Sequence, residues 1–334
     1  MIPTDLITGH TQTGRQMPAV SIIVPAFRVS EYIGAALDSV RAQTFTDYEI
    51  IVVNDGSPDT AELERALEPY RAEIVYLKQE NRGLSGARNT GIRAAHAPLI
   101  ALLDADDVWE PDYLAVQVSA MRRDPTIDVL YPDALYFGDA PEAGRTFMEL
   151  NPSSGEVTFE RLITQQCNVF IGVVARREML LRAGLFDESL RSSEDFDLWL
   201  RVVKAGGRIA YHRQALVRYR RHRASLSADP VWMCRHILQV LEKAEQTLTL
   251  TPVECETLRQ QQRRFEAELK FNEGKRAFFS GDTEQAIANL TKANAAFASR
   301  KLVLALWLLR RAPRTLLRAY QLRDRFYFRA DTKF

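Results

Sequence analysis

The sequence predicts an α/β fold in which a mostly parallel sheet is flanked by helices. Two observations lead to this prediction. Short apolar, β-branched runs recur before residue 103, and the segments between them are long enough for crossover helices. The runs are continuous rather than alternating, which is typical of strands covered on both faces. They are VSIIV (20–24), EIIVV (49–53), EIVYL (73–77) and PLIAL (98–102).

Local signals place helices between these strands. Ser57-Pro58 predicts a helix N-cap followed by proline at the first helical position. Another helix is predicted over 31–44, because apolar residues recur there with helical spacing. Its apolar face consists of Ile33, Leu37 and Val40.

The composition is that of a globular protein. The chain has 334 residues, 46% hydrophobic and 26% charged, enough for one large domain or two modest ones. Residues 1–17 lack the basic and apolar regions of a signal peptide, so we expect a flexible leader. Cys167, Cys234 and Cys255 fall at no metal-ligand or disulfide spacing, which suits a reducing, cytoplasmic location.

The rest of the chain changes character twice. Strands and loops alternate at first: we expect strands at 127–138 and 169–176, a helix at 194–205, and a final pair of strands around 208–212 and 215–220. Beyond residue 230 almost everything is expected to be helical. There, 271–297 resembles a single tetratricopeptide unit, two amphipathic helices turning at Ser280-Gly281. Because one unit cannot form a solenoid, we interpret it as a hairpin that caps the main domain.

Each of the first four predicted strands is followed by a polar loop that carries arginine, glycine or aspartate. These loops are PAFR, NDGSPD, QENRGLSGARN and DADD. The carboxyl ends of parallel strands lie along one edge of a sheet, and ligands bind in the crevice outside that edge. The four loops are therefore expected to surround one crevice.

The last of these loops crowds three carboxylates together: Asp104, Asp106 and Asp107. Carboxylates spaced i, i+2 at a strand end can both reach a divalent cation, and Mg²⁺ typically takes one or two carboxylates plus water and substrate phosphates. The alternative is that these residues cap a helix beginning near Pro111. Since one capping residue would suffice, three favour a metal and a bound diphosphate.

Five motifs, in order, resemble those of an inverting family 2 glycosyltransferase with the GT-A fold. They are VSIIVPAF, IIVVNDGS, NRGLSGARNTG, LLDADD and SEDFDLWLR. The resemblance covers roughly residues 18–228 and implies a GT-A nucleotide-diphospho-sugar transferase domain there. A helical extension at 229–299, which contains the hairpin, and a basic amphipathic tail at 300–334 would follow.

The resemblance implies metal-dependent transfer of one sugar from a nucleotide-diphosphate donor to a hydroxyl of a glycan or lipid-linked acceptor. UDP is the donor nucleotide that we expect first. The cofactor would be Mg²⁺ or Mn²⁺. The setting it implies is bacterial-type synthesis of cell-surface polysaccharide or glycolipid. The QxxRW motif of the processive synthases of this family is absent from the sequence, which favours addition of one sugar at a time.

The resemblance also assigns residues to the nucleotide. Asp55 would bind the base, since a carboxylate can accept the imide N–H of uracil or the N–H groups of guanine. Pro25 and Phe27 would lie near the base, where the aromatic ring can stack. Arg88 matches the nucleotide-contacting arginine of the family. The alternatives are a turn role for Asp55, a core position for Phe27, and a solvent-exposed place for Arg88 on a helix that begins near Ser85.

Metal ligands are implied in two places. Asp104 resembles the carboxylate that meets the ribose and the metal, and Asp106 resembles the principal metal ligand, while Asp107 fits a supporting or capping role. His222, in RYRRHRASLS at 218–227, resembles a residue that approaches the metal or the diphosphate. The alternative for His222 is a surface position in a basic strand.

Glu194-Asp195 resembles the acidic pair of the family, in which Glu194 faces the nucleotide sugar and Asp195 is the general base. On a helix, Asp195 shares a face with apolar residues, which places a carboxylate on the buried side of the first turn. In-line attack by the activated acceptor oxygen would invert the anomeric carbon. The alternative is that Ser192 to Asp195 forms a variant capping box.

The C-terminal tail concentrates positive charge. From Arg300 to the end there are ten Lys/Arg and two Asp, a net charge of +8. The apolar stretch 302–309 is too short to span a bilayer, but arginines beside leucines and aromatic residues are typical of a helix lying in an anionic headgroup layer. We therefore expect a peripheral position on the inner face of the membrane, with no nucleic-acid partner. The alternative is a helix packed on the domain with a solvated basic face.

Three other functions compete. The run IALLDADDV also fits the haloacid dehalogenase phosphatase pattern, with Asp104 as nucleophile, although that motif normally follows the first strand of its fold. A nicotinamide enzyme is disfavoured because NRGLSGARN lacks G-x-G-x-x-G and follows the third strand. A non-catalytic protein that binds a nucleotide sugar, or serves as a scaffold, is the third.

Overall fold

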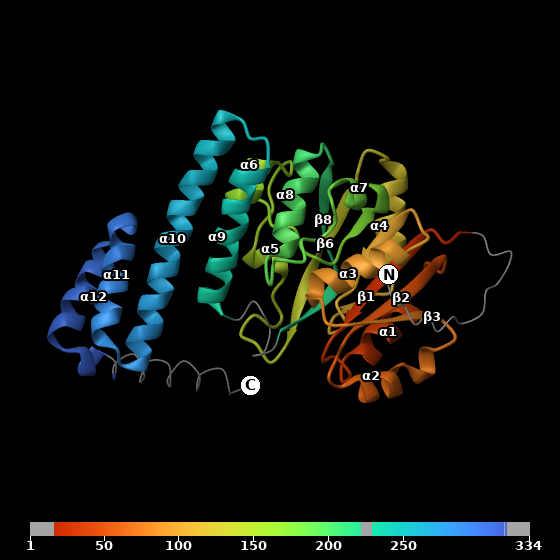
Figure 1. Cartoon of the computed structure of the whole chain (residues 1–334), viewed down its shortest axis with the longest axis horizontal. Helices are drawn as coiled ribbons and strands as arrows, with labels where there is room; N and C mark the ends of the chain where they lie inside the picture. Colours follow the sequence, from red (N-terminus) through yellow and green to blue (C-terminus); the bar gives the residue numbers. More distant parts are fainter. Residues whose placement is uncertain (1–16, 222–228, 317, 319–334) are drawn as a thin grey trace.

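The fold is a mixed α/β sheet flanked by helices, with further helices toward the C-terminus (Figure 1), as the sequence predicts. It comes from a computed structural model that describes residues 17–221, 229–316 and 318. The eight strands of the described sheet are β1 (Val20–Ala26), β2 (Tyr48–Asp55), β3 (Ile74–Gln79), β4 (Leu99–Leu102), β5 (Val108–Trp109), β6 (Val129–Gly138), β7 (Val174–Arg176) and β8 (Ile209–Arg221).

The helices lie between and after these strands. The first four are α1 (Ile33–Arg41), α2 (Thr60–Leu67), α3 (Gly83–Ala94) and α4 (Tyr113–Arg123). Four shorter or intermediate helices follow: α5 (Phe147–Leu150), α6 (Phe159–Ile163), α7 (Arg177–Arg182) and α8 (Glu194–Lys204). The C-terminal helices are α9 (Pro230–Thr247), α10 (Pro252–Ser280), α11 (Thr283–Phe297) and α12 (Arg300–Arg311).

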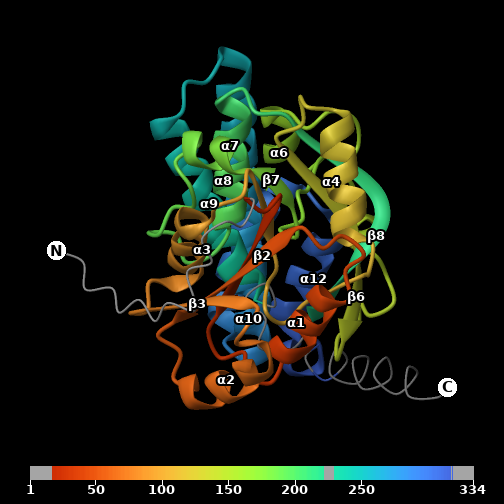
Figure 2. The same cartoon turned by 90° about the vertical axis from the view of Figure 1, so that its right-hand side faces the viewer.

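The sheet reverses its direction of growth between β1 and β4. Its order is β3-β2-β1-β4-β7-β6-β8-β5, and the pairs β3-β2, β2-β1 and β1-β4 are parallel. Because parallel crossovers are right-handed, growth from β1 to β3 and the return to β4 put their helices on opposite faces. Figures 1 and 2 accordingly show α2 and α3 on opposite sides of β1 and β2. Such a switch point is where open α/β sheets bind ligands.

Helix α3 lies unusually close to the sheet. A Cβ atom at Gly91 would come within 2.5 Å of Ile23 Cγ2 and 3.4 Å of Val53 Cγ2, so a larger residue would push the helix away from β1 and β2. This contact explains a glycine in the middle of a helix, where it otherwise costs stability. It also holds α3 at the carboxyl edge of the parallel strands.

The second half of the sheet folds the acidic loop back. Strand β7 pairs antiparallel with β4 and β6, β8 runs parallel to β6, and the short β5 pairs antiparallel with β8. The loop 103–107 leaves β4 in the middle of the sheet, and β5 then returns the chain onto β8, with Val108 opposite Arg218. The basic segment near the end of β8 therefore lies beside the carboxylates.

Most local predictions are confirmed. The first four strands form where the apolar runs predict them, and Ile33, Leu37 and Val40 are fully buried on α1. Strand β3 is only partly covered, however, because it is the edge strand of the sheet.

Three boundaries are wrong. Helix α2 begins at Thr60 and not at Pro58, because Ser57 hydrogen-bonds to Asp59 and accepts from the N–H of Arg28. Only the end of the apolar run 169–176 pairs in the sheet, as β7. The expected pair of strands at 208–220 is the single strand β8, which absorbs irregularities in register against β6.

The C-terminal helices belong to two apolar clusters. Leu241 of α9 and Leu258 and Phe265 of α10 are buried in the main core. A second cluster joins the end of α10 to α11 and α12 and includes Leu290 and Leu306. Helix α10 ends at Ser280 and turns through Gly281, whose φ of +87° is in the left-handed region. Figure 1 shows α10, α11 and α12 at the end of the molecule opposite β3.

Candidate active site at the carboxyl edge of the sheet

The loops after β1 and β2 are joined at the switch point. Pro25 is buried in β1, whereas Phe27, just beyond it, is 40% exposed, so the core position considered for Phe27 is wrong. Arg28 adopts a left-handed φ of +56°, and its N–H donates to Ser57 Oγ at 2.7 Å. The exposed aromatic ring thus stands next to the loop that follows β2.

Asp55 ends β2 and is 2% exposed. Its Oδ1 accepts hydrogen bonds from Gln79 Nε2 at 2.6 Å and from the N–H of Arg82 at 2.8 Å. Gly56 follows with φ of +63°, and a Cβ there would lie 2.9 Å from the backbone nitrogen of Asn81. The loops after β2 and β3 therefore meet at Asp55, which does more than form a turn.

Arg88 is buried in the centre of the site. Its guanidinium donates to Asp104 Oδ1 and to Glu194 Oε1, each at 2.7 Å, and its side chain is 2% exposed. The solvent-exposed position considered for Arg88 is therefore wrong. Burial lowers the pKa of the guanidinium, but Asp104 and Glu194 outweigh it and raise the pKa above its ordinary value. A permanent cation thus joins α3, the end of β4 and the start of α8.

Asp195 lies in the first turn of α8, partly buried beside this network. Ser193 precedes the helix with φ of +58° and does not cap it through its side chain, whose Oγ has no hydrogen-bond partner in the described chain. The capping box considered for this segment is therefore wrong. Burial, and then the charge of Glu194, raise the pKa of Asp195 to about 7, against the opposing effect of Arg88.

The acidic loop is held by the end of β8. The N–H of Arg220 donates to Asp107 Oδ1 and its Nε donates to the carbonyl oxygen of Asp106, both at 2.8 Å. The guanidinium lies 4.3 Å from the ring centroid of Phe137 and 4.8 Å from that of Tyr32. A planar cation packed between aromatic rings is thereby fixed next to the carboxylates.

The capping alternative for the acidic loop is also wrong. Helix α4 begins at Tyr113 with Asp112 in the N-cap position, and β5 separates it from Asp104 and its neighbours. Asp107 is instead buried, and burial together with the charges of Asp106 and Asp104 raises the pKa of its carboxyl. Asp106 and Asp104 therefore lie close enough to Asp107 to oppose its ionisation.

A divalent cation suits this loop. In the described part of the chain no three His, Cys, Asp or Glu side chains are grouped to hold a metal ion, and His222 lies outside the described residues. The donors at hand are two carboxylates, Asp104 and Asp106, two positions apart in the same loop. Mg²⁺ and similar hard cations accept such a pair when a diphosphate and water complete the shell. The donor set therefore fits Mg²⁺ or Mn²⁺.

Not all predicted residues touch one another. Asp104 and Glu194 meet through Arg88, and Asp195 lies close enough for its pKa to respond to all three. Asp55 stands at the same edge of the sheet but makes no hydrogen bond to them.

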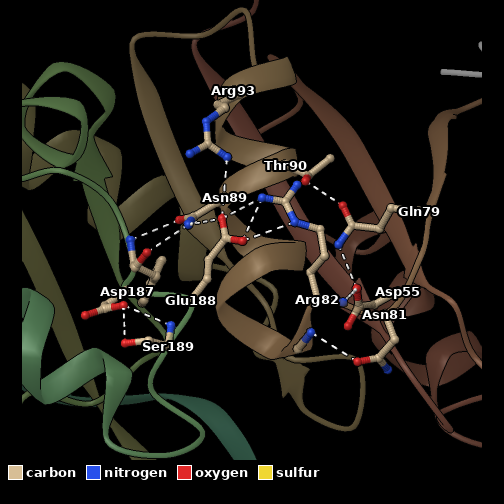
Figure 3. A network of polar contacts seen from close by, with 12 residues as sticks. Asp55, Gln79, Asn81, Arg82, Asn89, Thr90, Arg93, Asp187, Glu188 and Ser189 are labelled. Atoms are coloured by element: carbon tan, nitrogen blue, oxygen red, sulfur yellow. Dashed lines mark hydrogen bonds and ion pairs between the residues drawn. The ribbon is translucent and has the colours of Figure 1, made fainter. Parts of the chain in front are cut away.

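Several polar residues support the site in roles that the sequence does not predict. Glu188 accepts hydrogen bonds from Arg82 Nη2 at 2.6 Å and from Asn89 Nδ2 at 3.0 Å, contacts drawn as dashed lines in Figure 3. Thr90 and Gln79 continue this network toward Asp55. Glu188 lies in a segment without a recognisable motif, so only the fold brings it to the site, whereas Gln79 opens the predicted loop QENRGLSGARN.

Comparison with known proteins finds that the part of the chain that carries most of the candidate site matches glycosyltransferases. Residues 21–184, which contain Asp55, Arg88 and Asp104 and end before Asp195, match the model of Glycosyl transferase family 2. The chain is 32% identical over 225 residues to the uncharacterized glycosyltransferase EpsJ of Bacillus subtilis, covering 64% of each chain. It spans about a third of the length of three Rickettsia glycosyltransferases that it also matches.

Solved structures share the fold. Mannosyltransferase PcManGT from Pyrobaculum calidifontis, in complex with GDP-Man and Mn²⁺, has a TM-score of 0.61 at 20% identity, covering 99% of this chain and 92% of that one. S. aureus TarS 1–349 in complex with UDP has a TM-score of 0.56 at 19% identity, covering 91% of both. The fold is thus the GT-A fold, and the phosphatase and nicotinamide alternatives find no support. Residues 21–184 are thus similar to glycosyl transferase family 2, and the relatives that the chain matches are glycosyltransferases.

Proposed function

We propose that this glycosyltransferase is an inverting, metal-dependent enzyme that moves one sugar from a nucleotide-diphosphate donor to a hydroxyl of a glycan or lipid-linked acceptor. Synthesis of cell-surface polysaccharide or glycolipid is the setting we propose. One observation carries the proposal: Arg88 holds Asp104, at the switch point, and Glu194, adjacent to Asp195, at 2.7 Å each. A donor-side carboxylate and a candidate base therefore share one rigid network.

The donor nucleotide would lie along the carboxyl edge of β1, β2 and β4. Phe27 offers an exposed ring on which a base can stack, and Asp55 offers a buried carboxylate for its N–H groups. PcManGT was solved with GDP-Man and TarS with UDP, so both bases are precedents for this fold. We place UDP first, because the ring N–H of uracil suits a single carboxylate oxygen.

Asp195 would act as the general base. A carboxyl whose pKa lies near 7 takes up and releases protons at neutral pH, which suits a proton acceptor for a sugar hydroxyl. It would accept the hydroxyl proton as that oxygen bonds to the anomeric carbon. The bond from this carbon to the diphosphate oxygen breaks on the opposite face, and its electron pair leaves with the diphosphate, so the configuration is inverted.

Asp104 and Asp106 would hold the divalent cation, which when bound neutralises charge on the leaving diphosphate. Arg220 supports this assignment, since its bonds to Asp107 and Asp106 fix the loop. Arg88 has both its terminal nitrogens engaged by carboxylates, so we assign it to positioning Asp104 and Glu194 in place of direct contact with the nucleotide.

The experiment that tests the function uses the full chain with UDP, GDP and dTDP in the presence of Mg²⁺ or Mn²⁺. We expect one diphosphate to raise the melting temperature only with metal, and its sugar conjugate to release that diphosphate when an acceptor is added. Asp195→Asn should retain the thermal shift and lose about 10²- to 10⁴-fold in turnover. Asp47→Asn, an exposed carboxylate, is the matched control. Absence of a shift with every nucleotide would refute the proposal.

Helix α12 supports a second part of the proposal, a position on an anionic membrane. No helix in the described chain is long and apolar enough to cross a bilayer. Leu302, Leu306 and Leu309 pack into the second cluster, so the packed alternative accounts for one face of α12. Another face exposes Val303 (56%), Leu304 (58%) and Trp307 (49%) among basic residues, which suits the interface of a bilayer.

A further inference from the structure

The two carboxylate oxygens of Asp55 have different surroundings. Oδ1 accepts both hydrogen bonds that the described residues donate to this side chain, from Gln79 Nε2 at 2.6 Å and from the backbone N–H of Arg82 at 2.8 Å (Figure 3). No residue in the described ranges donates a hydrogen bond to Oδ2. The residue is only 2% exposed, so Oδ2 is an acceptor held at the site with no hydrogen-bond donor among the described residues.

The fold fixes which oxygen is engaged. A backbone N–H can only donate, so the position facing Arg82 must be an acceptor. Gln79 stands directly opposite Asp55 in the β2–β3 pairing, and its Oε1 accepts from Thr90 Oγ1 at 2.5 Å. Its amide nitrogen therefore faces Asp55. Two donors from different elements, β3 and the start of α3, converge on Oδ1.

The strand register brings Asp55 and Phe27 to the same edge of the sheet. Ala26 pairs with Asn54 in the β1–β2 register, so Phe27 and Asp55 each follow directly after a paired residue. The N–H of Arg28 donates to Ser57 Oγ and keeps the two loops together. A base stacked on the exposed ring of Phe27 would then present its ring edge to Asp55.

We propose that Gln79 and the backbone N–H of Arg82 orient Asp55 so that Oδ2 alone reads the base. An oxygen that only accepts favours a base that presents a ring N–H, such as uracil or guanine, over cytosine, whose N3 is itself an acceptor and which can donate only from its exocyclic amino group. Gln79 is thus a positioning residue for base specificity. This inference rests on the proposed function, in which Asp55 faces a nucleotide donor.

The orientation makes Asp55→Asn a directed change. In the variant the amide oxygen must face the N–H of Arg82 and the amide of Gln79, because both are donors. The amide nitrogen must then occupy the position of Oδ2. A donor now faces the base, which opposes the N3–H of uracil and complements N3 of cytosine. The substitution should therefore move the preference toward CDP, beyond simply weakening the binding of every nucleotide.

Isothermal titration of the full chain with UDP, GDP and CDP in Mg²⁺ tests this. For the wild type we expect UDP or GDP to bind more tightly than CDP. In Asp55→Asn the ratio of the Kd for CDP to the Kd for the preferred nucleotide should fall by about ten- to a hundredfold. Gln79→Met, which keeps the size of the side chain and removes the donor, should lower the ratio by several-fold. Lys78→Met, exposed on the same strand, should leave it unchanged.

The outcomes separate this inference from the proposed function. If UDP or GDP binds and is released from its sugar conjugate, but both variants weaken UDP, GDP and CDP by the same factor, the orientation of Asp55 is wrong and the enzyme assignment stands. A wild-type preference for CDP would also overturn it. If no nucleoside diphosphate binds, both proposals fail. Should Asp55→Asn fail to fold, the base ratio of Gln79→Met, read beside its melting temperature, still decides.

Discussion

Arg88 and Glu194 are 106 residues apart in the chain, yet a guanidinium nitrogen of one lies 2.7 Å from a carboxylate oxygen of the other. The same guanidinium also bonds to Asp104, so its charge serves two carboxylates at once. Removing the cation would leave both acids without their partner in a poorly solvated place. The pair therefore links stability and site geometry in a way that can be measured.

Arg88→Met should be strongly destabilising. Breaking a buried ion pair by removing one partner typically costs about 3–5 kcal/mol, because the remaining charge is uncompensated. We expect a loss of this size in the free energy of unfolding in urea at pH 7.5. Arg65→Met removes an exposed i, i+3 pair with Glu62 and should cost less than about 0.5 kcal/mol. Equal losses in the two variants would show that the network is not held by Arg88.

Asp195 should make the folded protein less stable as the pH rises. Its pKa is raised from the ordinary value of 3.8 to about 7 in the folded protein. The folded state therefore holds the proton more tightly, so the stability that Asp195 contributes is fully present below about pH 4 and is lost as the pH rises through 7. Asp195→Asn, which cannot ionise, should unfold at a higher urea concentration than the wild type at pH 8.

The difference in the free energy of unfolding between Asp195→Asn and the wild type should be large enough to measure. One unit of pKa corresponds to about 1.4 kcal/mol, and partial exposure reduces the benefit, so we expect a gain of roughly 1–3 kcal/mol at pH 8 and little at pH 4. Denaturation without metal or nucleotide isolates the contribution of the side chain. Asp47→Asn should follow the wild type at both pH values. A variant that is less stable than the wild type at pH 8 would contradict the raised pKa.

The sequence predicts those parts of the fold that depend on neighbouring residues. Continuous apolar runs are local, and so the strand that ends with Asp55 and the strand that leads to Asp104 appear where they are expected. Arg88 is different, because its helix shows no apolar spacing that would reveal a buried cation. Its burial depends on Asp104 and Glu194, which meet it only after the crossovers are complete.

Residues that position others are equally hidden. Glu188 accepts hydrogen bonds from Arg82 and Asn89, which lie about a hundred residues earlier in the chain, and no motif near Glu188 in the sequence indicates these contacts. The sequence predicts two strands in place of β8 because Arg213 and Gln214 are polar, and both side chains are exposed. The chain nevertheless continues, since irregular register against β6 accommodates them. In β8, the pairing with β6 overrides the local signal that predicts a break between two strands.

Lys243 should couple the C-terminal helices to α8. Its Nζ lies 2.7 Å from Asp197 Oδ1 and 2.7 Å from Asp187 Oδ2, so α9 holds both α8, whose first turn carries Asp195, and the loop before it. Lys243→Met should lower the free energy of unfolding by about 1–3 kcal/mol, because Asp197 is buried and loses one of its two cations. Lys292→Met, exposed on α11, should have little effect.

Acid should weaken this coupling. Burial raises the pKa of Asp187, but Lys243 and Ser189 outweigh it and hold the pKa at about 2. Stability from a depressed carboxyl is present above about pH 4 and is lost as the pH falls through 2, so the difference between Lys243→Met and the wild type should shrink on acidification. A double-mutant cycle that combines Lys243→Met with Asp197→Asn measures the interaction between Lys243 and Asp197 directly. A coupling energy of zero would mean that α9 packs without this contact.

Helix α12 should bind anionic vesicles through its exposed face. The guanidinium of Arg311 lies 4.6 Å from the ring centroid of Trp307, next to exposed Leu304, so cationic and apolar groups reach the same surface. Each basic residue near an anionic surface contributes about 1 kcal/mol, so Arg310→Gln/Arg311→Gln should weaken binding to phosphatidylglycerol vesicles by roughly 10-fold or more. Leu304→Ser/Trp307→Ala should weaken it further at high salt, where the apolar contribution remains.

The matched control is Val253→Ser, which removes an exposed apolar residue from α10. Co-sedimentation with phosphatidylglycerol vesicles, phosphatidylcholine vesicles and no lipid separates membrane binding from self-association. We expect wild-type protein to pellet only with the anionic vesicles, less so as salt rises, and the control to match it, because the charges that attract the surface are unchanged. Equal pelleting with both lipids, or of all variants alike, would assign the exposed face of α12 to something other than an anionic bilayer.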